Sequence, residues 1–106
     1  MAQRIYEVPE LPGESLAAAS AFHERHLAEV RDAIEPREGE SLVVTLPAAG
    51  PDHADWRSAI ARDLARAMTP ARVNLAAGAD PSKLAALIVY LAGAPGVTGH
   101  YLETHD

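Results

Sequence analysis

Apolar residues are grouped along this chain in blocks with two different spacings. Ser41–Leu46 is an almost unbroken apolar run, which is typical of a strand buried on both faces. Arg4–Val8 is a shorter strand candidate that ends at Pro9. Two more strands are expected over 72–78 and 97–104. The pattern therefore predicts four short strands separated by longer segments.

The two long segments after the first and second strands carry apolar residues at helical spacing. We expect a long helix over 15–35, because its apolar stripe stops at Pro36. A second helix is expected over 55–68, with Asp52 or Asp55 as its capping residue. Both helices are rich in alanine, so they can approach a sheet or another helix closely.

A third helix begins at Asp80-Pro81 and ends at Gly93. Aspartate can accept from the free N–H groups of a first helical turn, and proline loses no hydrogen bond at the first helical position. The order is β-α-β-α-β-α-β, which predicts an α/β fold with a four-stranded parallel sheet and right-handed crossovers. We expect three layers, with two helices on one face of the sheet and one on the other.

The composition restricts the classes of function that fit this chain. Its 106 residues form a single expected domain over 1–106, and the net charge of −6 disfavours nucleic acid and anionic membrane surfaces as partners. Cysteine is absent from the sequence, which excludes disulfides and thiolate chemistry. No apolar run approaches the length of a membrane span, and no signal peptide is recognised, so we expect a cytoplasmic protein.

Several spaced motifs in the second half of the chain resemble one known family. They are Ala61–Pro70, Arg72-Val73-Asn74, Asp80-Pro81 and Val97-Thr98-Gly99-His100. Together they resemble the C-terminal half of a short-chain dehydrogenase/reductase, and the earlier segments resemble that family more weakly. The resemblance implies a Rossmann-like half-fold without the N-terminal half that holds the dinucleotide.

The chain departs from that family at the positions that carry chemistry. Counting along the second helix places Ala49 at the family's catalytic tyrosine, His53 at its lysine and Ala48 at its serine. No glycine-rich turn joins a strand to a helix, because the segment 93–99 follows a helix and precedes a strand. The resemblance therefore implies a pseudoenzyme with no catalytic residues and no cofactor.

Two residual sites remain to be weighed. His53 lies where parallel strands end, so it could line a pocket with Thr45, Asp55 and Gly78. The alternative is that His53 is an exposed residue at a helix start. His23 and His26 could offer two ligands to a metal from one helix, but a site needs three or four, so we expect surface histidines and no metal.

The resemblance also implies how the chain associates, because members of that family pair two of their helices with those of a neighbour. Those helices correspond to 15–35 and 55–68, so we expect a non-catalytic interaction module that forms a homodimer, or that pairs with a full-length reductase subunit. The alternative is a small oxidoreductase-like or nucleotide-binding protein with a degenerate site at the strand ends. The candidate interface residues are Ala18, Phe22, Trp56, Ile60 and Leu64.

Overall fold

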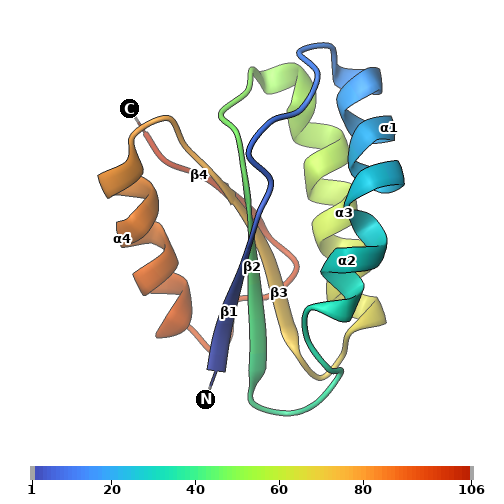
Figure 1. Ribbon diagram of the computed structural model, residues 1–106. Coiled ribbons are helices and arrows are strands. Elements are labelled where there is room, and N and C mark those ends of the chain that lie inside the picture. Colours follow the sequence, from blue (N-terminus) through green and yellow to red (C-terminus); the bar gives the residue numbers. More distant parts are fainter. Residues whose placement is uncertain (1, 106) are drawn as a thin grey trace.

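The computed structural model describes residues 2–105, which form one four-stranded sheet with helices on both faces (Figure 1). In this part of the chain no helix is both long and apolar enough to span a membrane. The elements in chain order are β1 (Ala2–Glu7), α1 (Ser15–Arg25), α2 (Leu27–Asp32), β2 (Glu40–Leu46), the 3₁₀ turn η1 (Pro51–His53), α3 (Ala54–Ala67), β3 (Arg72–Ala77), α4 (Pro81–Ala92) and β4 (Tyr101–Glu103).

The sheet is parallel throughout and its strands lie in the order β1-β2-β3-β4. The two central strands are buried almost completely, as the apolar run at 41–46 predicts. Leu42 pairs with Val73, and Val44 pairs with Leu75, so the largest apolar side chains of both strands line up on one face. The predicted α/β architecture with a four-stranded parallel sheet is confirmed.

Helices α1, α2 and α3 cover one face of the sheet, and α4 covers the other (Figure 1). Alternate residues of β2 point to opposite faces of the sheet: Leu42 and Val44 pack in the larger core, and Val43 packs under α4. The larger core also holds Phe22 and Leu64 from the helices. This arrangement confirms the three-layer fold.

The position of α4 corrects one expectation about the connections. Strand order increases steadily across the sheet, so a crossover on one face has the opposite hand from a crossover on the other. The expectation of right-handed crossovers throughout is therefore wrong for at least one of them. The cause lies in α4, whose partly buried residues Leu84, Leu87 and Ile88 pack on the face that the other helices leave uncovered.

The first predicted helix is two helices, which corrects its expected span of 15–35. His26 leaves the helical conformation, with φ −121° and ψ −27°, and α2 ends at Asp32. Glu14 caps α1 by accepting from the N–H groups of Leu16 and Ala17. The break falls at a residue that is neither proline nor glycine, and there the hydroxyl of Tyr6 on β1 lies 3.0 Å from Nδ1 of His26.

The second helix differs in detail from expectation, whereas the cap of the third is confirmed. Neither Asp52 nor Asp55 caps α3, because η1 leads into the helix and no side chain bonds its first turn. Asp80 does cap α4, where its carboxylate accepts from the N–H groups of Ser82 and Lys83. The hydrogen bond from the Ser82 hydroxyl is the main reason that the pKa of Asp80 lies below its usual value.

The last strand is shorter than the predicted 97–104, and a buried side chain holds the loop before it. Asn74 donates to the carbonyl of Val97 and accepts from the N–H of His100, both at 3.0 Å. Gly99 in this loop has φ +77°, a conformation that favours glycine. The loop is therefore anchored to β3 before Tyr101 joins the sheet.

Candidate functional site

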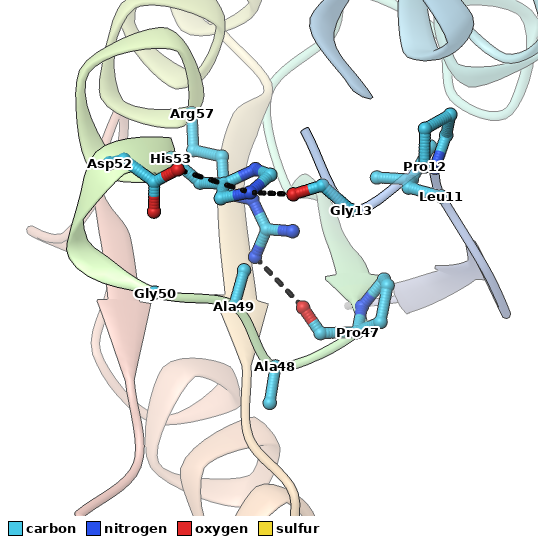
Figure 2. Close-up of a pocket in the computed structure, with 10 residues that line it drawn as sticks. All are labelled: Leu11, Pro12, Gly13, Pro47, Ala48, Ala49, Gly50, Asp52, His53 and Arg57. Atoms are coloured by element: carbon cyan, nitrogen blue, oxygen red, sulfur yellow. Dashed lines mark hydrogen bonds and ion pairs between the residues drawn. The ribbon is translucent and has the colours of Figure 1, made fainter. Parts of the chain in front are cut away.

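A cavity of about 180 Å³ lies beyond the carboxyl end of β2, beside the start of α3 (Figure 2). Ligands of open parallel sheets commonly bind at this end of the strands. Three segments form the walls: the loop after β1, the loop after β2, and the η1–α3 junction. The lining residues are Leu11, Pro12, Gly13, Pro47, Ala48, Ala49, Gly50, Asp52, His53 and Arg57.

His53 is buried in the wall of this cavity, with 4% of its surface exposed. Its Nε2 lies 3.0 Å from the carbonyl oxygen of Gly13, and the indole N–H of Trp56 donates to its Nδ1 at 3.3 Å. A carbonyl can only accept, so Nε2 carries the proton and Nδ1 is the acceptor. The ring is therefore a neutral imidazole with both nitrogens engaged, and the alternative of an exposed His53 is wrong.

Arg57 is the most deeply buried charged residue described at the site, with 1% of its surface exposed. One terminal nitrogen, Nη1, donates to the carbonyl of Pro47 at 2.9 Å and to the hydroxyl of Tyr101 at 3.0 Å. Its guanidinium carbon also lies 5.4 Å from the ring centroid of Trp56 and 5.5 Å from that of Tyr101. This arginine joins the end of β2 to the last strand.

Arg57 was not singled out from the sequence, although one signal pointed to it. It lies three and seven residues before Ile60 and Leu64, so helical spacing places it on the core-facing side of α3. A charged residue at such a position must be paired or hydrogen-bonded when buried. Its partner Tyr101 is also half-buried, and this burial raises the pKa of the phenol, an effect that the adjacent guanidinium opposes.

The two alanines that the resemblance places at catalytic positions also line the cavity. Ala48 and Ala49 follow β2 and line the cavity, with Ala49 nearer to the guanidinium of Arg57 (Figure 2). A methyl group has no proton to donate and no lone pair to attack a substrate. These positions can shape the cavity, but they supply no acid, base or nucleophile.

The four residues expected to share a pocket are not brought together, because only His53 lines this cavity. Thr45 is buried and shares the sheet face of Val43, the face that α4 covers. Asp55 is exposed on the first turn of α3. Gly78 packs against the side chain of Thr104, which occupies the space that a larger residue would need.

Four of the five candidate interface residues lie in the core of the chain itself. Ala18, Phe22, Ile60 and Leu64 are each at most 6% exposed, so their side chains have almost no free surface. Trp56 is half-buried, and its ring centroid lies 5.7 Å from that of Phe22. Any association through these helices would have to use their outward side chains.

The two candidate metal ligands have other partners. Nδ1 of His23 donates to the carbonyl of Ala19 within α1 at 2.7 Å, and Nδ1 of His26 lies beside the Tyr6 hydroxyl. Among the residues that the structure describes, no group of three or more histidine, cysteine or acidic side chains could hold a metal ion. The geometry offers no metal site in that part of the chain.

The comparisons with known proteins agree with this architecture. A family model described as "Short chain dehydrogenase-like protein" (SDR-like) matches residues 6–104. A search of curated proteins and a search of solved structures found no significant match. Because the match covers most of the chain, from the end of β1 through β4, the chain belongs to the SDR-like family of short chain dehydrogenase-like proteins.

Proposed function

We propose that this domain is a non-catalytic member of its family and acts as an interaction module that forms a homodimer. The chemistry at the strand ends supports the first part of the proposal. Ala48 and Ala49 have no reactive groups, and both ring nitrogens of His53 are already hydrogen-bonded, one to the loop carbonyl of Gly13 and the other to Trp56 on α3. The cavity, at about 180 Å³, is also below the usual volume of a cofactor site.

The observation that carries the dimer is the outer edge of β1. The N–H of Val8 donates to the carbonyl of Thr45 on β2. Residues of a parallel strand bond alternately to their two sides, so Gln3, Ile5 and Glu7 direct their N–H and C=O groups away from β2. In the described sheet no strand pairs with that edge. Such an edge is a template for another strand.

Exposed apolar side chains lie beside this edge. Ile5 pairs with Val43, so its side chain lies on the face of the sheet that α4 covers, and it is 55% exposed. Val89 and Tyr90 of α4 are 71% and 59% exposed. The side-chain amide of Gln3 donates to the carbonyl of Ile88, so the start of β1 and the end of α4 are adjacent. Association at the edge would cover apolar surface as well as backbone groups.

The register of β1 makes a second copy the best occupant of the edge. If two copies pair antiparallel about a twofold axis at Ile5, Ile5 faces the partner's Ile5 and Arg4 faces the partner's Tyr6. Ile5 then forms a hydrogen-bonded pair, as its outward N–H and C=O require. Pairs of isoleucines and of arginine with tyrosine are favourable across strands. The dimer would contain a continuous eight-stranded sheet.

The helices that the resemblance implies provide a second candidate surface. Between α2 and α3 lies a groove of about 230 Å³, lined by His23, Leu27, Arg31, Ile60, Asp63, Leu64 and Ala67. Its rim carries both Arg31 and Asp63, so a second copy could supply opposite charges. Leu16 of α1 is also exposed. A full-length reductase subunit could occupy either surface.

Light scattering at tens of micromolar tests the proposal with three matched variants. We expect a dimer for the wild-type chain, a monomer for Ile5→Lys, and unchanged dimers for Ile5→Val and Leu16→Glu. Loss of the dimer in Leu16→Glu alone would move the interface to the helices. A monomeric wild-type chain would overturn the homodimer. If the chain then purified together with a reductase subunit, the heteromeric form would be favoured.

A further inference from the structure

Arg57 has no acidic partner in the described structure. The ion pairs there involve Arg4, Arg37 and Arg66, but not Arg57. Asp52 is the one carboxylate that lines the cavity, and it is 67% exposed and lies 3.9 Å from Nε2 of His53. A buried charge is costly unless a counter-charge or hydrogen bonds compensate it. The guanidinium is therefore only partly compensated.

One nitrogen of the guanidinium, Nε, is unsatisfied. Nη1 has two acceptors, the carbonyl of Pro47 and the hydroxyl of Tyr101. Nε is buried and has no hydrogen-bond partner. Nε and Nη2 are neighbours on the edge that binds two oxygens of a carboxylate or phosphate in bidentate ion pairs. Figure 2 shows the group reaching into the space between Gly13 and the loop after β2.

The helix that begins at the cavity adds a favourable field. Asp52 and His53 line the cavity, and α3 runs for 14 residues from Ala54. No side chain caps its first turn, and none caps η1. The N–H groups of His53 and Ala54 are bonded to the carbonyls of Gly50 and Pro51, so this terminus favours an anion through the helix dipole. The buried guanidinium and the uncapped terminus thus act on the same space.

We propose that this cavity binds a small oxyanion, a carboxylate or a phosphate group, through the Nε–Nη2 edge of Arg57. The volume of about 180 Å³ admits such a group and is too small for a dinucleotide. The exposed carboxylate of Asp52 at the rim opposes the anion and keeps the affinity modest. This site is independent of the proposed dimer, because β1 uses its outer edge and the cavity lies beyond the strand ends.

Fluorescence of Trp56 tests the site, because this only tryptophan of the chain touches both Arg57 and His53. Inorganic phosphate and acetate are titrated separately at constant ionic strength, with chloride as the reference. We expect a saturable change with at least one of the two oxyanions and none with chloride. The stronger of the two identifies the group that the site prefers.

Three variants make the test specific. Arg57→Lys keeps the charge but loses the bidentate edge, so we expect it to bind the oxyanion at least tenfold more weakly. Arg66→Lys, at an exposed arginine, is the matched control and should leave oxyanion binding unchanged. Asp52→Asn removes the opposing charge without touching the core, and we expect about fivefold tighter binding. The proposal is overturned if neither oxyanion gives a saturable change, or if Asp52→Asn and Arg57→Lys both bind like the wild type.

Discussion

Replacing His53 by alanine separates a structural role of this ring from a catalytic one. The ring is buried, accepts from the indole N–H of Trp56 and donates to the carbonyl of Gly13. The substitution removes both hydrogen bonds and leaves the half-buried indole N–H without its acceptor. Each bond contributes about 0.5–1.5 kcal/mol, and an orphaned buried donor costs about 1–3 kcal/mol. We expect a total loss of about 2–3 kcal/mol in the free energy of unfolding.

Urea unfolding followed by Trp56 fluorescence and by far-ultraviolet circular dichroism measures this loss. With a denaturant dependence of about 1–3 kcal/mol per molar, the midpoint falls by roughly 1 M. His23→Ala is the matched control, because His23 is exposed and bonds only within its own helix. We expect it to change stability by about 0.5 kcal/mol at most.

A conservative variant tests whether the two hydrogen bonds, rather than volume alone, carry the effect. In His53→Gln the amide oxygen can accept from Trp56 and the amide nitrogen can donate to Gly13. We expect it to recover at least about 1 kcal/mol of the loss. If His53→Ala unfolds within about 0.5 kcal/mol of the wild type, the structural role assigned to His53 is refuted.

Three further predictions concern other parts of the chain. The pKa of Asp80 is lowered in the folded state, so its ionised carboxylate stabilises the fold above about pH 4, and this contribution is lost as the pH falls through the lowered value. Between pH 2 and 5 the urea midpoint should therefore fall less steeply with decreasing pH in Asp80→Asn than in the wild type. Gly99→Ala should lower the free energy of unfolding by about 1–3 kcal/mol, because φ is +77° and the new methyl would meet Ala65 at 3.3 Å. Gly96→Ala is the control, because that glycine has open space around it, and thermal unfolding of both variants should show no change for it. Calorimetry with millimolar NADPH should give no binding heat, and a saturable signal would favour the nucleotide-binding alternative.

The parts of the fold that could be predicted depend on neighbours in sequence. The apolar run at 41–46 can be buried only as a central strand, and Asp80-Pro81 fixes a helix start through its own local bonds. The break at His26 could not be predicted, because no proline or glycine marks it and the contact that His26 makes there is with Tyr6, 20 residues away on β1. The hand of the last crossover depends on which sheet face is left uncovered, and that is a property of the assembled layers.

In the candidate site too, features set by the order of elements could be predicted, and features set by distant contacts could not. The sequence indicates the strand ends and His53, since the order of strands and helices locates them. It does not indicate that Thr45 and Gly78 face elsewhere, because one residue of register decides the face of a strand. It also gives only a weak signal for Arg57, whose burial depends on Tyr101, 44 residues away.

Hydrogen exchange of the β1 amides tests the central claim most directly, that the free edge of the sheet binds a second copy. The outward N–H of Ile5 is exposed in a single chain and hydrogen-bonded in the proposed dimer. We expect its exchange, measured by NMR, to slow as the protein concentration rises from about 1 to 500 μM, while the inward N–H of Val8, bonded to Thr45, stays protected throughout. Fast exchange of Ile5 at every concentration, with a particle mass of 11.2 kDa, would contradict the account.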